Sequence, residues 1–144
     1  EVEIDKETGG VEIVRYTVID DVGTVINPLL LKGQIYGGVA QGAGQALMED
    51  FTMEAESGQV VAGSFMDYAM PRAADFCHFD VVSNEVPTPT NPLGVKGAGE
   101  AGTVGALPAV MNAINDALAP LGADYVSMPA TPKKVWEAIK NARG

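Results

Sequence analysis

Residues 27–49 have the pattern of an α-helix, and the glycines among them limit what can pack against it. Apolar residues recur at every fourth position, which is the spacing of one face of an α-helix. They are Leu31, Ile35, Val39, Ala43 and Leu47. Asn27-Pro28 provides the expected start, because asparagine caps helices and proline suits their first turn. The helix is expected to run from there to about Glu49.

The same segment carries five glycines, which are unfavourable inside a helix. They are Gly33, Gly37, Gly38, Gly42 and Gly44. Each costs about 0.5–1 kcal/mol relative to alanine, so we expect something to press against this helical backbone. One possibility is tight packing against another helix or a sheet. The other is a ligand that lies along the helix, beside Gln34, Gln41 and Gln45.

A second glycine cluster, residues 94–103, holds four glycines together with Lys96 and Glu100. Glycine lets a backbone approach another group closely. Backbone N–H groups at the start of the helix that follows can bind anionic groups. Glu100 is therefore a candidate general base, provided that burial raises the pKa of its carboxyl. The simpler alternative is a flexible surface turn with a solvated glutamate.

The remaining patterns predict an α+β fold with an antiparallel or mixed sheet and about three helices. The first two strands should form a hairpin, because turn residues separate them. The expected strands are Val2–Asp5, Val11–Ile19, Phe51–Gln59 with its turn and Phe76–Ser83, with Val60–Ala62 as a short apolar return. The span between these elements contains no linker, so residues 1–144 are interpreted as one domain.

Two further helices follow the glycine cluster. Pro108 fits a helix only in the first turn, so we expect the second helix to begin near Gly105 or Ala106. The third is expected from Lys133 to Asn141, after the cap at Thr131-Pro132. Its predicted buried face consists of Val135, Trp136 and Ile139.

Composition and charge exclude several classes of function. The net charge of −10 argues against nucleic acids and anionic membranes as partners. No apolar run approaches the roughly 20 residues of a membrane span. Cys77 is the only cysteine, which suits a reducing compartment and predicts a cytoplasmic location. His78 is the only histidine, so no histidine-based metal cluster or catalytic triad is expected.

Five segments, in order along nearly the whole chain, resemble the large subunit of the molybdenum hydroxylases. That family includes xanthine dehydrogenase, aldehyde oxidoreductase and aerobic carbon monoxide dehydrogenase. The segment from Gly33 to Gly42 resembles the glycine- and glutamine-rich helix of the family. The others are Asp20 to Pro28, Asp67 to Pro71, Val95 to Glu100, and Met128 to Pro132 with Val135-Trp136.

The resemblance implies a role for each candidate site residue. Glu100 would be the catalytic base, which takes the proton from the hydroxide on molybdenum as its oxygen attacks the substrate. Gln34 would hydrogen-bond the cofactor near the metal and its pterin. Lys96, Gly97, Ala98 and Gly99 would line the cofactor. Gln41 and the helix glycines would let the helix pass close to it.

The resemblance also implies a cofactor and partners. The cofactor would be molybdopterin cytosine dinucleotide, whose dithiolene holds the metal, so that no protein metal ligand is needed. Since the family's large subunit is several times longer, the chain is interpreted as the C-terminal part of its molybdopterin-binding domain. The partners would be the rest of that subunit and the iron–sulfur and FAD subunits. The implied reaction is hydroxylation of an aldehyde, an N-heterocycle or CO with oxygen from water, with no activity expected from the chain alone.

Two other functions stay open. The chain could be a non-catalytic homologous module that only packs against a partner subunit. A weaker alternative is a free-standing binder of small ligands, in which the glycine cluster forms an anion-binding nest.

Overall fold

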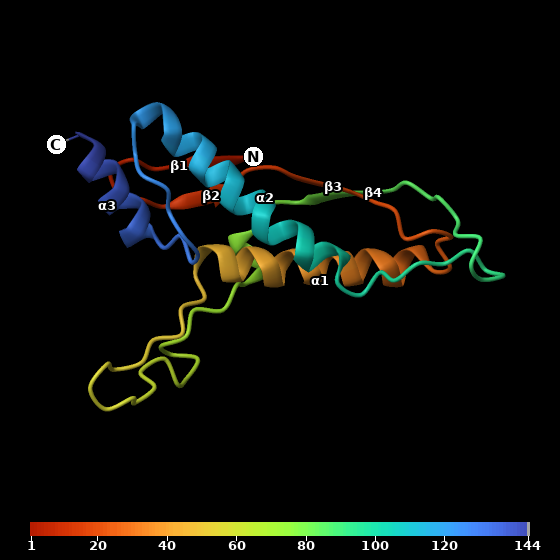
Figure 1. Ribbon diagram of the computed structural model, residues 1–144, viewed down its shortest axis with the longest axis horizontal. Helices are drawn as coiled ribbons and strands as arrows, with labels where there is room; N and C mark the ends of the chain where they lie inside the picture. Colours follow the sequence, from red (N-terminus) through yellow and green to blue (C-terminus); the bar gives the residue numbers. More distant parts are fainter. Residues whose placement is uncertain (144) are drawn as a thin grey trace.

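The computed structural model describes residues 1–143, and within them it has the predicted α+β architecture (Figure 1). The α-helices are α1 (Pro28–Leu47), α2 (Ala101–Leu118) and α3 (Pro132–Arg143). Two short 3-10 helices are η1 (Ala73–Asp75) and η2 (Ala119–Leu121). The strands are β1 (Val2–Ile4), β2 (Val11–Ile13), β3 (Tyr16–Asp20) and β4 (Phe79–Ser83).

The strands form one antiparallel and one parallel pair. The predicted hairpin is confirmed, since β1 pairs antiparallel with β2 and Val2 lies opposite Ile13. The prediction of one continuous strand to Ile19 is wrong. The backbone N–H groups of Val14 and Arg15 both donate to the carbonyl of Glu1, at 3.1 and 3.4 Å. This break lets β3 leave the hairpin and pair in parallel with β4.

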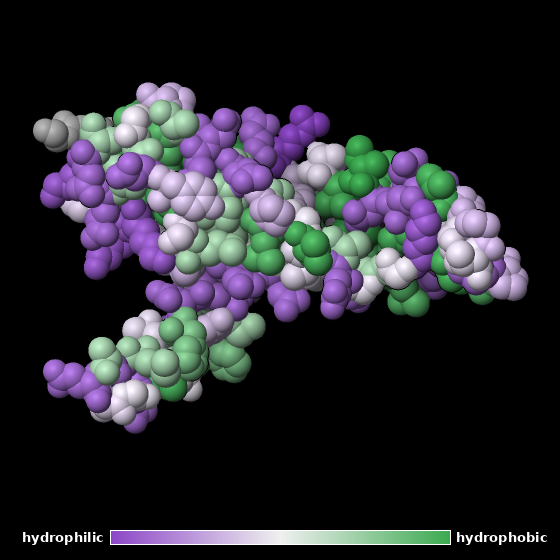
Figure 2. All heavy atoms as spheres, in the orientation of Figure 1, coloured by the Kyte–Doolittle hydropathy of each residue, from purple (hydrophilic) through white to green (hydrophobic). Residues whose placement is uncertain are grey.

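Residues 49–72 form an arm that extends away from the helices (Figure 1). The predicted strand in this segment is wrong, because a single bridge between Met53 and Val60 is its only pairing within the described chain. Figure 2 shows apolar atoms over much of the arm, and Phe65 is 83% exposed. A strand here would have no apolar face of this chain to pack on. The predicted start of the next strand at Phe76 is also wrong. Strand β4 begins at Phe79, which lies opposite Tyr16, the first residue of β3.

The base of the arm is fixed to the end of α1. The hydroxyl of Tyr68 donates to Oε2 of Glu49 at 2.6 Å. Pro71 packs against Gly44, where an added Cβ would lie 2.6 Å from Pro71 Cγ. The hydrogen bond to Glu49 is the main cause that raises the pKa of the Tyr68 hydroxyl above its ordinary value. The arm therefore leaves and returns to the body at one place.

Helices α1 and α2 cross in close contact and form the frame of the molecule (Figure 1). A Cβ on Gly38 would lie 2.9 Å from the backbone N of Thr103, and one on Gly42 would lie 2.8 Å from Ala106 Cβ. A Cβ on Gly102 would lie 2.5 Å from the carbonyl O of Ile35. Tight helix packing therefore accounts for two of the glycines that made α1 unusual.

The predicted start of α2 is wrong, because the helix begins at Ala101 and contains Pro108 well inside it. Proline removes one backbone hydrogen bond of a helix and is normally excluded from its interior. Here the turns before Pro108 are held by α1, against which Gly102 and Ala106 are buried. Tertiary packing thus outweighs the local preference of proline.

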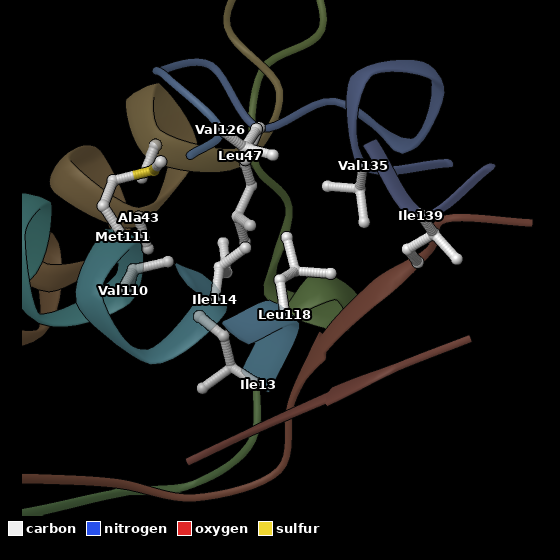
Figure 3. Packing of buried hydrophobic residues seen from close by; sticks show 12 residues of the cluster. Ile13, Ala43, Leu47, Val110, Met111, Ile114, Leu118, Val126, Val135 and Ile139 are labelled. Atoms are coloured by element: carbon white, nitrogen blue, oxygen red, sulfur yellow. The ribbon is translucent and has the colours of Figure 1, made fainter. Parts of the chain in front are cut away.

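The core lies where α1, α2, α3 and β2 meet. Its buried side chains include those labelled in Figure 3: Ile13, Ala43, Leu47, Val110, Met111, Ile114, Leu118, Val126, Val135 and Ile139. A smaller cluster joins α1 and α2 to β4 through Ile35, Val39, Phe79 and Ala106.

The prediction for α3 is wrong at Trp136, which is 37% exposed and lies under the ammonium of Lys140. Val135 and Ile139 are buried as predicted.

Candidate functional site

The glycine loop, residues 94–100, is anchored at its start to the turn that follows β3. Gly23 and Val95 form an isolated antiparallel bridge, and the N–H of Lys96 donates to the carbonyl of Val22 at 2.9 Å. Gly23 has a φ of +67°, and a Cβ there would lie 2.2 Å from the carbonyl O of Gly94. Only glycine combines that backbone conformation with so close an approach. The loop therefore starts from a fixed position.

Lys96 forms an ion pair with Asp21, and both side chains are about one-third exposed, at 34% and 32%. Oδ1 of Asp21 also accepts the N–H groups of Gly23 at 2.9 Å and Val86 at 3.2 Å. The hydrogen bond from Lys96, and then that from Gly23, lower the pKa of Asp21 below its ordinary value of 3.8. The pair is therefore intact at neutral pH, and its contribution is lost only as the pH falls below that value.

Gln34 fixes the other end of the loop. It lies on α1, and its Nε2 donates to the carbonyl O of Gly99 at 2.7 Å. The two residues are 65 positions apart in the sequence. The structure thus brings the helix segment that contains Gln34 next to the glycine loop that leads to Glu100.

Glu100 stands at the junction between the glycine loop and α2. It occupies the N-cap position with φ −109° and ψ −1°, and its side chain does not cap the helix. The side chain is exposed within residues 1–143, so this part of the chain does not supply the burial expected of a general base. The position of its backbone is nevertheless fixed on both sides, by Gln34 before it and by the packing of Gly102 after it.

The backbone between the two anchors is open to ligands. A Cβ added to Gly97 or Gly99 would meet nothing within 4 Å, and the same holds for Gly33 and Gly37 on α1. Within residues 1–143, the N–H groups of Gly97 and Ala98 donate no hydrogen bond. Together with the uncapped start of α2, these groups suit an anionic ligand such as a pterin phosphate. The residues present therefore fit the cofactor that the sequence motifs imply.

Gln41 lies seven residues after Gln34 on the same helix and points toward the first turn of α2. Its Oε1 lies 3.5 Å from the hydroxyl O of Thr103, and the side chain is exposed. Gln41 thus lies beside the helix crossing, while Gln34 contacts the glycine loop itself.

Sequence reasoning missed the role of Asp21, which was placed in the resembling segment Asp20 to Pro28 but not among the candidate site residues. An aspartate two residues before a glycine is a turn signal, and the bond from the N–H of Gly23 agrees with it. The ion pair with Lys96 spans 75 positions, and no local pattern carries it.

The described residues offer neither a metal cluster nor a membrane-spanning helix. Residues 1–143 contain no group of three or more histidine, cysteine, aspartate or glutamate side chains placed to hold a metal ion. None of the helices among these residues is long and apolar enough to cross a membrane. A hollow of about 560 Å³ between β2, the end of α1 and η1 lies away from the glycine loop. The candidate site is therefore an open surface of this chain.

Comparison with known proteins shows the family to which this chain belongs. A family model described as the molybdopterin cofactor-binding domain matches residues 1–77. The chain belongs to this family, and the resemblance to the molybdenum hydroxylases is confirmed.

Particular relatives extend the similarity to nearly the whole chain. The carbon monoxide dehydrogenase large chain of Hydrogenophaga pseudoflava is 35% identical over 96% of this chain and 17% of its own length. The nicotine 6-hydroxylase large subunit of Paenarthrobacter nicotinovorans is 41% identical, also over 96% of this chain and 17% of its own length. A crystal structure of a Cu,Mo-CO dehydrogenase superposes with a TM-score of 0.93 and 34% identity, covering 99% of this chain and 18% of that one. The chain thus spans about one-sixth of the relatives it matches.

Proposed function

We propose that this chain is the part of a molybdenum hydroxylase large subunit that supplies the catalytic base, Glu100. The reaction is the oxidative hydroxylation of an aldehyde, an N-heterocycle or CO with oxygen from water. The observation that carries the proposal is the hydrogen bond from Gln34 to the carbonyl of Gly99, directly before Glu100. It joins the helix motif and the loop motif into one site.

The cofactor is proposed to be molybdopterin cytosine dinucleotide, held jointly with the rest of the subunit. When bound, the molybdenum centre supplies the redox chemistry of the reaction. In this chain, the open N–H groups of Gly97 and Ala98 bind its anionic groups. Gln34 orients the loop and the cofactor edge beside it, while Gly33 and Gly37 leave room along α1.

Glu100 accepts a proton at its carboxylate during the hydroxylation. It stands at the start of α2, beside the partial positive charge of the helix N-terminus. The carboxylate makes no hydrogen bond within residues 1–143, so it is free to contact a substrate. In this proposal the remainder of the subunit closes the site and excludes water from this carboxylate.

The partners in this proposal are the rest of the large subunit and the iron–sulfur and FAD subunits. Large apolar side chains are exposed on several surfaces, and two of these surfaces are proposed to pack against further polypeptide. One is the arm, with Phe65 and Met66. The other is the end of the molecule where α1 begins, with Ile26, Leu29 and Leu30 (Figures 1 and 2). A cytoplasmic location is proposed from the single cysteine.

Replacement of Gln34 by alanine in the full-length subunit tests the cofactor contact. We expect fewer molybdenum atoms and less cytidine nucleotide per subunit, because the variant loses the bond that holds Gly99. Metal analysis and nucleotide release measure both quantities. Gln45→Ala is the matched control, since Gln45 is exposed on the same helix and far from the loop. Unchanged cofactor content and unchanged activity in Gln34→Ala would assign Gln34 to the helix surface only.

A further inference from the structure

Asp21 holds three segments that are distant in the sequence. Its carboxylate binds the ammonium of Lys96 at the start of the glycine loop, the N–H of Gly23 after β3, and the N–H of Val86 after β4. We propose that Asp21 is a positioning residue: through Lys96 it fixes the glycine loop so that Glu100, at the end of that loop, stays in its working position. This inference rests on the proposed role of Glu100 as the base.

The need for this anchor follows from the composition of the loop. Between Lys96 and Gly99, the backbone of Gly97 and Ala98 makes no hydrogen bond within the described residues. Glycine has the largest conformational freedom of any residue, so such a segment is ordered only by its ends. One end is held by Asp21 together with the backbone bond from Lys96 to Val22, and the other end by Gln34. Loss of the ion pair removes the only side-chain contact of Lys96 within the described residues, and the start of the segment is then held by backbone bonds alone.

The charge of Asp21 is the property that matters for the loop. Oδ1 accepts the two backbone N–H groups, while Oδ2 binds the ammonium of Lys96. An amide at this position keeps an oxygen for the N–H groups but loses the ionic bond, which is the stronger type. Asp21→Asn therefore removes the ionic bond to Lys96 but keeps an acceptor for the N–H of Gly23, which stabilises the turn.

Hydrogen exchange in the full-length subunit tests the anchor without using activity. Asp21→Asn should make the hydrogen-bonded amide of Lys96, at the start of the loop, exchange about tenfold faster, both with and without cofactor, as expected from the loss of a charge-assisted bond. Asp80→Asn is the control, because Asp80 is an exposed acid on β4 without a polar partner among the described residues. Unchanged exchange in Asp21→Asn would overturn the proposal.

Kinetics of the assembled enzyme test the consequence for Glu100. Asp21→Asn should lower kcat about 10- to 100-fold with little change in KM, because a base displaced by about 1 Å reacts poorly while the substrate still binds. Asp21→Glu keeps the charge and should restore part of kcat. In a Lys96→Met background, Asp21→Asn should have little further effect, since its action passes through Lys96. If Asp21→Asn lowers kcat equally in the unchanged enzyme and in the Lys96→Met variant, the proposal is overturned.

The two proposals can fail separately. If Glu100→Gln keeps its turnover while Asp21→Asn still speeds exchange of the Lys96 amide, the role of Glu100 is wrong and the anchor is retained as a structural contact only. If Glu100→Gln abolishes turnover while Asp21→Asn changes neither exchange nor kcat, the anchor is wrong and the base is retained.

Discussion

Replacing Glu100 with glutamine in the assembled enzyme is expected to lower turnover by about 10²–10⁴-fold, which is the usual contribution of a general base. Glutamine has nearly the same shape but cannot accept the proton. Cofactor content should stay near that of the unchanged enzyme, because the backbone of the loop is held by Gln34 and Asp21 and does not depend on the side chain of residue 100. Single-turnover kinetics with metal analysis measure both quantities.

A matched control for this substitution is Glu3→Gln. Glu3 is exposed on β1 and takes no part in the site. It should leave turnover unchanged, which separates loss of the base from loss of one negative charge. Turnover retained in Glu100→Gln would contradict the proposed function and favour a module that only packs against a partner.

A second large effect is expected at the crossing of α1 and α2. Gly102→Ala should destabilise the pair of helices by at least about 1–3 kcal/mol, the usual range for overpacking. The added Cβ would lie 2.5 Å from the carbonyl O of Ile35 and 3.0 Å from the N of Val39, and these backbone atoms cannot rotate away. Hydrogen exchange of the α1 and α2 amides reports the free energy of local opening.

Gly105→Ala on the same helix provides the comparison. A Cβ on Gly105 would meet nothing within 4 Å, so the higher helix propensity of alanine should make the change neutral or stabilising by about 0.5–1 kcal/mol. Equal effects at Gly102 and Gly105 would show that helix propensity, and not the helix contact, explains these glycines.

Features encoded by neighbouring residues could be predicted from the sequence. Helix α1 begins where the Asn27-Pro28 signal placed it, and Oδ1 of Asn27 accepts the N–H of Leu30 at 3.1 Å. The β1–β2 hairpin followed from turn residues between two short alternating runs. In each case the signal and the structure lie within a few residues of each other.

The errors arose where distant parts of the chain decide the local structure. Pro108 argued for a late start of α2, but packing against α1 keeps the earlier turns helical. Residues 51–59 were interpreted as a strand with its turn, yet the two sheets within residues 1–143 do not include them. The five glycines of α1 were recognised as a sign of close contact, but only the structure separates the packed Gly38 and Gly42 from the open Gly33 and Gly37.

The candidate site was predictable in its residues but not in its internal contacts. The resemblance to the molybdenum hydroxylases indicated Gln34 and Glu100, and the small size of glycine indicated that the loop leaves room for a ligand. Neither indicated that Gln34 binds the carbonyl just before Glu100, or that Asp21 engages Lys96. Both contacts join residues more than 60 positions apart, which patterns of neighbouring residues cannot show.

The parallel pairing of β3 with β4 has a consequence for the order of folding. Tyr16 lies opposite Phe79, so this pair closes a loop of roughly 60 residues, while the hairpin and α1 form from local contacts. Asp21 follows β3, and Val86 follows β4, so their hydrogen bond forms only after that slow closure. Pulse-labelling during refolding of the full subunit should therefore protect the amides of α1 before that of Val86. Under the proposed function, the Asp21 anchor of the glycine loop is thus completed only after this non-local strand pairing.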